Sequence, residues 1–497
     1  MKRLGPVVAL AATAALLGCK SSRQAVPLRN LVLIVVDTLR QDHLRAYAYG
    51  RETAPTFTRL AEGGVLWDGV SPTSWTKPAV ASILTGLHPL RHQAFASADT
   101  LPEGAETLAE RLRSRGYTTM GITANAWLSR RAGFAQGFAS YYSMLDDLGH
   151  GQFSTADEVN AELLPRLESL SPPFFLYVHY LDPHAPYDPD RDHAGRPLAG
   201  RLAARKRGVS IQELRMGEVL HRPPDLLEDA ADLYDGEIRR TDDAIGGLLR
   251  ELRRLRLSEG TLTVVTSDHG EEMQEHGRMG HGQTLYEEVV RVPLLFHAPG
   301  VLPAGARLGT ASLLDVTPTV LELLSVPIGP TEVEGQSLAA SMRPAAASSS
   351  PRTEQSWTAR ELLLHLDLDS GDPALFLQGG RALALRGERF KLVLSQEPYR
   401  KELFDYRADP REQVNQLASG QPVAVMKPMA ERLADQYNAL GNHSLARRAD
   451  VDLDKQERMA ALGYLGAGAA GAPGRGIPRR IQPADPGPDG SLGWPQR

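Results

Sequence analysis

The chain has 497 residues, enough for about three average domains or for one large α/β domain with an accessory domain. Its 42% hydrophobic and 23% charged residues are typical of a globular protein, which excludes fibrous, disordered and multi-spanning membrane classes. The 55 lysines and arginines against 60 aspartates and glutamates give a net charge of −5, without the basic surplus that a phosphate-binding surface needs. We therefore expect no nucleic-acid partner.

The start of the chain predicts export and lipid anchoring. A basic beginning precedes an apolar run over residues 7–17 that is too short to span a bilayer and has the length of a signal-peptide core. Residues 16–19 read Leu-Leu-Gly-Cys and resemble a bacterial lipoprotein cleavage box; Cys19 is the single cysteine, so it has no disulfide partner. We predict a signal peptide over 1–18, lipidation of Cys19 and a tether over 19–29. The protein would work outside the cytoplasm, anchored by its lipid in the periplasm or at the outer membrane; the alternative is a plain signal peptide with an incidental thiol.

Three apolar runs rich in β-branched and aromatic residues each end in an aspartate, and they cover residues 30–37, 173–182 and 262–268. Continuous apolar runs of this length are typical of strands buried on both faces of a parallel sheet. Ligands of open α/β sheets bind beyond the carboxyl ends of the strands. We therefore expect Asp37, Asp182 and Asp268 to converge at one sheet edge, together with the adjacent His184 and His269.

Helical patterns over residues 105–115 and 226–256 separate the predicted strands, and the alternation continues up to an apolar run near residue 290. Farther on, residues 382–395 predict two strands that turn at Gly387, which indicates an antiparallel accessory sheet. The predicted organisation is a catalytic domain over 30–340, a linker over 341–356, a C-terminal subdomain over 357–440 and a Gly/Pro-rich, mostly disordered tail over 441–497.

A polar segment with a basic centre covers residues 190–224. We interpret it as a solvated surface excursion or as a lid that supplies arginine to an anionic substrate.

The sequence Asp268-His269-Gly270 sets a carboxylate beside an imidazole, and the glycine lets the chain turn away sharply. With Asp37 as the third donor, this is a candidate metal site. An imidazole ligand favours zinc or manganese, and calcium or magnesium remains open. His276 and His281 follow in a Gly-rich loop, where they could bind a metal or a substrate oxygen, or be structural. A second metal site built from Asp182 and His276 is a weaker hypothesis.

Residues 74–86 predict a helix that starts near Pro78 and ends at Gly86, so Thr76 would be its N-cap or the neighbour of the N-cap. A hydroxyl at the positive end of the helix dipole lies where a phosphoryl or sulfuryl group would bind, and a metal would lower its pKa and make it a nucleophile. The alternative is that Thr76 only caps the helix. Lys77 would either reach the anion or face solvent.

Taken together, these motifs resemble the sulfatase family of the alkaline phosphatase superfamily over residues 30–420. The motifs that carry the resemblance are residues 36–40, 84–86, 182–184, 267–271, 287–293, 403–405 and 409–410. The resemblance implies an α/β fold: a three-layer alkaline-phosphatase-like domain with a central, mostly parallel sheet, and a small C-terminal antiparallel sheet subdomain. It also implies one bound divalent metal.

The chain departs from the family pattern at the nucleophile. Thr76 stands where sulfatases carry the Cys or Ser that becomes formylglycine, and threonine cannot undergo that conversion. Several of the family's basic sulfate-binding residues are also missing, near positions occupied here by Val80, Ala124, Ala126 and His281. In these respects the chain is more similar to the superfamily's phosphodiesterases and its phosphoethanolamine or glycerol-phosphate transferases.

We therefore predict a metal-dependent hydrolase of a sulfate or phosphate ester or diester, with Thr76 as nucleophile and phosphoryl chemistry favoured. The predicted metal donors are Asp37, Thr76, Asp268 and His269. His184 and His281 would protonate the leaving oxygen or hold substrate oxygens, with Lys77 as a further candidate. The substrate would be an anionic ester, such as an envelope glycan or phospholipid. The alternatives are a phosphoethanolamine- or glycerol-phosphate-type transferase and an inactive binding lipoprotein.

Overall fold

The computed structural model describes residues 27–96, 98–151, 153–185, 187, 192, 194, 224–329, 333–343, 360–367, 381–396, 399–418 and 424–441. The predicted signal peptide with Cys19, nearly all of the polar segment 190–224, most of the predicted linker and the tail beyond residue 441 lie outside these ranges. Within the described part, no helix combines the length and the apolar character needed to cross a membrane.

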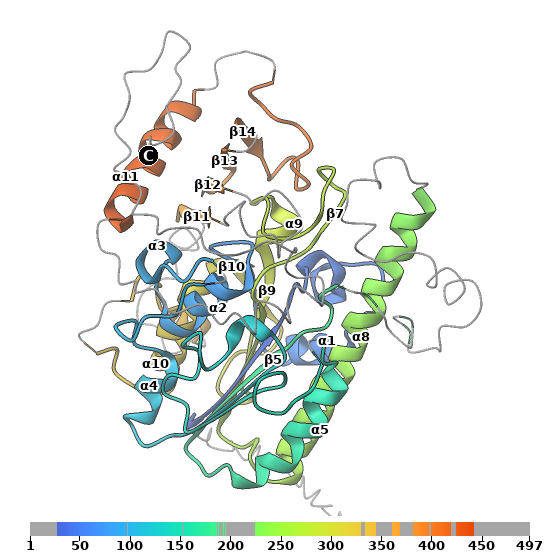
Figure 1. The fold of residues 1–497 in the computed structure, drawn as a ribbon, viewed down its shortest axis with the longest axis vertical. Coiled ribbons are helices and arrows are strands. Elements are labelled where there is room, and N and C mark those ends of the chain that lie inside the picture. The colour runs from blue at the N-terminus through green and yellow to red at the C-terminus, as the bar shows by residue number, and fades with distance from the viewer. Residues whose placement is uncertain are drawn as a thin grey trace, which may run out of the picture.

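A central sheet of eight strands forms the core of the larger part of the described chain (Figure 1). Its strands, in spatial order, are β10 (Ala306–Ser312), β2 (Val65–Val70), β9 (Arg291–His297), β6 (Thr261–Ser267), β1 (Asn30–Val36), β5 (Phe174–Tyr180), β3 (Thr118–Thr123) and β4 (Ser140–Ser143). The pairings β2–β9 and β6–β9 are antiparallel, and the other pairings in this sheet are parallel. The predicted mostly parallel sheet is confirmed, with β9 as the reversed strand.

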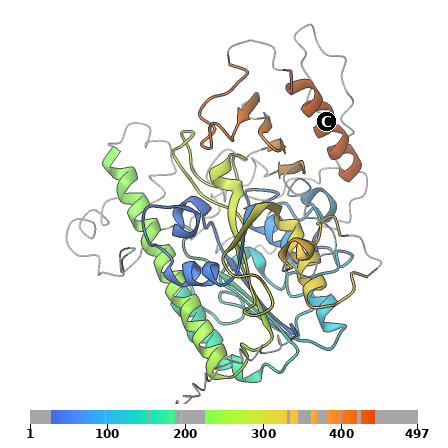
Figure 2. The same cartoon turned by 180° about the vertical axis from the view of Figure 1, so that it is seen from behind.

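Helices cover both faces of this sheet, as the two opposite views show (Figures 1 and 2). Alternate residues of β1 face opposite sides, so that Leu33 and Val35 join one apolar cluster while Ile34 and Val36 join another. The helices of the first cluster are α2 (Thr76–Thr85), α4 (Leu108–Arg113) and α10 (Val316–Leu323). Those of the second are α1 (Pro55–Glu62), α5 (Ala156–Arg166) and α8 (Pro224–Arg254). The three-layer prediction is therefore confirmed.

The predicted helix over 105–115 is shorter in the structure, because a capping box starts α4 late. Thr107 accepts a hydrogen bond from the amide of Glu110, and the Glu110 carboxylate accepts one from the amide of Thr107. Two further short α-helices of the described residues are α3 (Pro89–His92) and α9 (Glu287–Val290).

A four-stranded antiparallel sheet and one helix form the C-terminal part, above the central sheet in Figure 1. The strands are β11 (Leu362–Asp367), β12 (Arg381–Arg386), β13 (Phe390–Gln396) and β14 (Tyr399–Asp405), and the helix is α11 (Met426–Gly441). Strands β12 and β13 meet through Gly387, as the sequence predicts. A buried ion-pair network ties this sheet to α9: Glu287 bonds Arg386 at 3.0 Å and Lys391 at 3.1 Å.

Candidate active site

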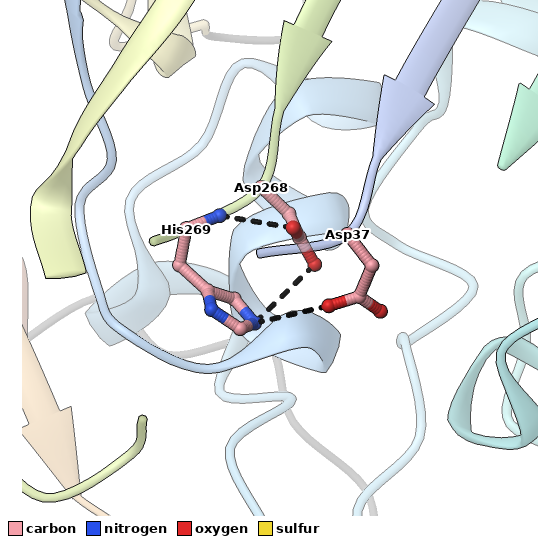
Figure 3. A group of neighbouring side chains, drawn as sticks. All are labelled: Asp37, Asp268 and His269. Atoms are coloured by element: carbon pink, nitrogen blue, oxygen red, sulfur yellow. Dashed lines mark hydrogen bonds and ion pairs between the residues drawn. The ribbon is translucent and has the colours of Figure 1, made fainter. Parts of the chain in front are cut away.

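The pairing of β1 with β6 brings the predicted metal donors together. Val36 pairs with Ser267 in the parallel register, so the next residues, Asp37 and Asp268, leave the same sheet edge side by side. One ligand atom each from Asp37, Asp268 and His269 lies within 4.8 Å of the other two, and all three residues are fully buried. Nε2 of His269 is 3.4 Å from Oδ2 of Asp268 and 3.7 Å from Oδ1 of Asp37 (Figure 3).

Gly270 lets the chain turn directly after these donors. A Cβ atom at this position would lie 2.0 Å from the carbonyl oxygen of Glu288, a separation that no side chain tolerates. The glycine amide instead donates to the Val289 carbonyl at 2.9 Å. The close approach of two backbones therefore fixes His269 at the sheet edge.

The donor group has the unsatisfied buried oxygens that a cation would neutralise. Oδ1 of Asp37 and Oδ2 of Asp268 are buried and have no hydrogen-bond partner in the described part of the chain. Burial and the Asp268 carboxylate raise the pKa of Asp37. Burial also opposes ionisation of Asp268, but His269 and His179 lower its pKa below the usual range. Two buried carboxylates and a buried imidazole at this spacing fit one divalent cation.

Thr76 lies beside this donor group as the first residue of α2. Trp75 is the N-cap, and its side chain makes no capping hydrogen bond. The hypothesis that Thr76 itself is the N-cap is therefore wrong, and the alternative that Thr76 is the neighbour of the N-cap is confirmed. Its Oγ1 atom is instead 3.1 Å from Nε2 of His269, and the residue is 1% exposed. Helix α2 ends at Gly86 with φ of 72°, which is the turn predicted from the sequence.

Two further imidazoles reach the same place from separate loops. His281 follows strand β8 (Met279–Gly280). The centre of its ring lies 4.4 Å from the ring centre of His269 and 5.0 Å from the ring centre of His184. His184 comes from the loop after β5, so the structure brings together both predicted proton donors. Nδ1 of His281 is 2.9 Å from the buried carboxylate of Glu271.

Three neighbours of the site were not predicted: Asn125, His179 and Glu271. Nδ2 of Asn125 donates to Oδ2 of Asp37 at 2.7 Å and lies 3.5 Å from Oγ1 of Thr76. Its place two residues beyond β3 is the available sequence signal, because that strand also ends at the functional sheet edge. His179 lies within 4.0 Å of both carboxylates.

Two predicted residues, Lys77 and Asp182, have their polar groups on partners outside the donor group. The ammonium of Lys77 donates to the carbonyls of Ala96 and Asp99, each at 3.0 Å, and lies 5.5 Å from the Trp127 ring centre. The side chain is buried, so the hypothesis that it faces solvent is wrong. Asp182 turns its carboxylate to the amide of Ala156 at 2.7 Å, away from the donor group, and burial raises its pKa to about 6.

The hypothesis of a second metal site formed by Asp182 and His276 is also wrong. His276, in the loop between β7 (Glu272–Met273) and β8, has its Nδ1 2.6 Å from Glu288 and its Nε2 3.1 Å from the carbonyl of Glu412. Ligand atoms of Glu272, His276 and Glu288 do lie within 4.8 Å of one another, but both nitrogens of His276 already have partners. The ring serves as an ion-pair partner that links this loop to the C-terminal part.

This ion pair predicts a pH-dependent stability. Burial lowers the pKa of His276, but the hydrogen bond and charge of Glu288 outweigh it and raise the pKa to about 9. Because the folded-state pKa lies above the usual 6.5, the stabilisation is fully present below pH 6.5 and is lost as the pH rises through 9. We expect urea unfolding to show a loss of stability from pH 6.5 to 9.5 that is smaller in Glu288→Gln. Equal losses in both proteins would contradict the assignment.

A family model described as "Sulfatase" matches residues 29–326, more than half of the chain. A second, "N-sulphoglucosamine sulphohydrolase, C-terminal", matches residues 275–439. Together the two matches cover the central sheet and the C-terminal part.

Relatives named as sulfatases or as a sulfotransferase share modest sequence identity with the chain. The ulvan-active sulfatase of Formosa agariphila is 26% identical over 507 residues, covering 92% of this chain and 90% of that protein. The low-salt glycan biosynthesis sulfotransferase Agl7 of Haloferax volcanii is 26% identical over 310 residues. The chain spans 62% of the length of Agl7. It spans 66% of the length of human arylsulfatase A, to which it is 28% identical. Both shares are less than two thirds.

Solved structures agree on the fold. A protein solved with its substrate D-glucosamine-2-N,6-O-disulfate has a TM-score of 0.66 at 21% identity, covering 84% of this chain and 98% of that one. The phosphonate monoester hydrolase of Agrobacterium radiobacter has a TM-score of 0.61 at 20% identity, covering 82% and 96%. The match over more than half of its length, on a fold shared with these proteins, shows that the chain belongs to the sulfatase family of the alkaline phosphatase superfamily.

Proposed function

We propose that this sulfatase-family chain is a metal-dependent hydrolase that cleaves an anionic ester by using the Thr76 hydroxyl as nucleophile. The observation that carries the proposal is the position of Oγ1, 3.1 Å from His269 Nε2 and beside two buried carboxylates. Asn125 holds Asp37 from the other side and reaches the same hydroxyl. A threonine that only stabilised its helix would have no reason to face this group.

Asp37, Asp268 and His269 would hold one divalent cation, with zinc or manganese preferred because one donor is an imidazole. When bound, the cation supplies positive charge that lowers the pKa of a nearby hydroxyl and screens an anionic ester. This is the chemistry that a buried threonine needs, since its hydroxyl is a weak nucleophile by itself.

The reaction then divides into two displacements. Oγ1 of Thr76 releases its proton to solvent water and forms a bond to phosphorus or sulfur while the bond to the leaving oxygen breaks, and the protonated imidazole of His281 or His184 donates a proton to that oxygen and becomes neutral. Glu271 stabilises the protonated form of His281 through its 2.9 Å contact with Nδ1. Water next attacks the phosphorus or sulfur atom of the threonyl ester and gives a proton to the neutral imidazole, the bond to Oγ1 breaks, Oγ1 recovers a proton from solvent water, and the inorganic anion is released.

The Thr76 side chain favours a phosphate ester over a sulfate ester as the substrate. Phosphoryl groups pass readily through a covalent ester on a hydroxyl, whereas formylglycine gives sulfatases a route for expelling sulfate that an ordinary threonyl ester lacks. The second candidate is a sulfate ester, which is supported by relatives such as the ulvan-active sulfatase.

A small pocket lies against the loop that follows His281. It lies between the loop that follows His281 and the C-terminal sheet, and its lining includes Arg278, Tyr286, Arg381 and Arg400. The Ser74 hydroxyl, two residues before Thr76, donates to the Thr284 carbonyl in that loop at 2.6 Å, which couples the pocket wall to the start of α2. We propose an anionic sugar ester as the substrate, which is supported by relatives such as the ulvan-active sulfatase and by the similar protein solved with D-glucosamine-2-N,6-O-disulfate.

A panel of chromogenic esters tests this function. We expect zinc- or manganese-loaded protein to cleave p-nitrophenyl phosphate or its diester with a higher kcat/KM than p-nitrophenyl sulfate, with Thr76→Ala as the blank. The reverse order would favour the sulfate candidate. Product analysis with an alcohol acceptor present separates hydrolysis from the transferase alternative, and metal-loaded protein that cleaves none of the esters would contradict the proposal.

A further inference from the structure

We infer that Tyr234 is a positioning residue of the metal site, whose hydroxyl holds the strained turn that directs Asp37 toward the other donors. The inference rests on the proposed cation at Asp37, Asp268 and His269. It deepens the proposed function by extending the site to α8, through a residue that none of the predicted motifs includes.

The chain turns sharply directly after Asp37. The Asp37 amide still donates to the Tyr180 carbonyl at 3.0 Å, at the sheet edge, but Thr38 takes a φ of 56°. This left-handed conformation is an outlier for a β-branched residue, because Cβ crowds the following carbonyl oxygen. Oγ1 of Thr38 is buried and has no hydrogen-bond partner among the described residues, so the side chain does not stabilise its own turn. The surroundings therefore impose the conformation.

The hydroxyl of Tyr234 makes two of the contacts that hold this turn. It donates to the Thr38 carbonyl at 2.6 Å and accepts from the Arg40 amide at 2.9 Å, so one oxygen atom bridges the two ends of a three-residue segment. Both hydrogen bonds are buried, and the tyrosine side chain is fully buried. Removing the hydroxyl would deprive a buried carbonyl and a buried amide of this partner, which favours a different backbone conformation at Thr38.

The same turn also orients Asp268. The Thr38 amide donates to Oδ1 of Asp268 at 3.3 Å, and the His269 amide donates to the same oxygen at 2.9 Å. These bonds occupy Oδ1, while Oδ2 of Asp268 has no hydrogen-bond partner in the described part of the chain. A shift of Thr38 would therefore disturb both carboxylates of the donor group, Asp37 through the backbone and Asp268 through its hydrogen bond.

Helix α8 is a firm support for Tyr234. The tyrosine belongs to the second apolar cluster, through which α8 packs against the central sheet. The next residue, Asp235, accepts a hydrogen bond from the Tyr49 hydroxyl at 2.8 Å. Farther along the helix, Asp242 accepts from two amides in the first turn of α1, at 2.7 and 2.8 Å. The helix thus holds the segment after Asp37 at successive places, and Tyr234 holds the part adjacent to the donors.

A rival explanation is that the Tyr234 hydroxyl only stabilises the fold. Its removal would then lower the free energy of unfolding, but folded protein would bind zinc as tightly as the wild type. If the hydroxyl holds a strained turn, its removal weakens zinc binding, and Thr38→Gly reverses that loss because glycine adopts a positive φ without the Cβ penalty. Zinc affinity with and without this second substitution therefore separates the two roles.

The test compares the full-length wild type, Tyr234→Phe and the double variant Tyr234→Phe/Thr38→Gly. Phenylalanine keeps the ring in the apolar cluster and removes the hydroxyl alone. The matched control is Tyr47→Phe. The Tyr47 hydroxyl likewise donates to a backbone carbonyl, that of Trp67 at 2.7 Å, and accepts from a backbone amide, that of Leu294 at 3.1 Å, but these partners lie on β2 and β9, which carry none of the donors. Zinc affinity is measured by competition with a chelator, and circular dichroism verifies folding.

We expect Tyr234→Phe to weaken zinc binding about 10–100-fold, the range for residues that orient a metal ligand, and the control to leave it unchanged. The double variant should recover the wild-type affinity. A loss below about 10-fold in Tyr234→Phe, or a loss that persists in the double variant, would overturn the inference. If Tyr234→Phe does not fold, the double variant decides: folded protein with wild-type affinity supports the inference, and unfolded or weakly binding protein overturns it.

The same measurements distinguish this inference from the proposed function. Wild-type protein that binds no zinc would contradict the proposed cation, and the positioning role with it, before any variant is compared. A wrong assignment of Thr76 would appear in turnover and leave these zinc affinities intact.

Discussion

Replacing Thr76 by alanine is expected to lower ester hydrolysis by about 10⁴-fold or more, the scale seen when an enzyme loses its nucleophile. Oγ1 of Thr76 lies 3.1 Å from Nε2 of His269, within the donor group. The adjacent Lys77 does not replace the lost hydroxyl, because its ammonium donates to the carbonyls of Ala96 and Asp99. Steady-state kinetics on the preferred chromogenic ester measures the loss.

Thr76→Ser is the matched variant, because it keeps the hydroxyl and removes a methyl group. We expect it to retain most of the turnover that Thr76→Ala loses. Zinc content of the alanine variant should stay near that of the wild type, since Asp37, Asp268 and His269 remain. Hydrolysis by Thr76→Ala at a rate close to that of the wild type would refute the nucleophile.

Removing the cation is expected to abolish turnover, and zinc or manganese should restore it. Asp268→Asn should have the same effect as the chelator and lower kcat by about 10³-fold or more, because a metal contributes several kcal/mol to the transition state. The substitution keeps the shape of a fully buried side chain while it removes the charge that the cation needs. Metal analysis and kinetics on the same samples measure both effects.

Asp182→Asn provides the control for this prediction. Asp182 also follows a strand of the central sheet and is an equivalent candidate in the sequence, but its carboxylate accepts a hydrogen bond from the Ala156 amide. We expect the variant to keep its metal and its activity. Equal metal loss in both variants would show that the donor group has been assigned to the wrong carboxylate.

The sequence was sufficient to predict the donors that come directly after strands. Asp37, Asp268 and His269 meet because parallel neighbours present their carboxyl ends at one edge, and the pairing of Val36 with Ser267 does this here. Thr76 was predicted because a proline near the start and a glycine at the end delimit its helix. These signals are local, and the sheet geometry converts them into proximity.

Residues placed by long-range packing were not predictable in the same way. Lys77 follows the nucleophile, yet the returning loop at residues 96–99 captures its ammonium. Asn125 was missed because the family pattern suggested basic residues beside it, whereas its amide bonds Asp37. His179 lies within an apolar strand, where strand alternation with Phe175 and Tyr177 was the available clue to its direction.

Thr76 as the nucleophile is tested most sharply by a rapid-quench experiment on metal-loaded wild type in its first turnover, followed by peptide mass spectrometry. We expect a phosphoryl ester on the Thr76 peptide, or a sulfuryl ester if the substrate is a sulfate ester. This ester should appear with the first equivalent of alcohol and disappear as water attacks it. A burst of alcohol with unmodified Thr76, or the group on any other residue, would contradict it.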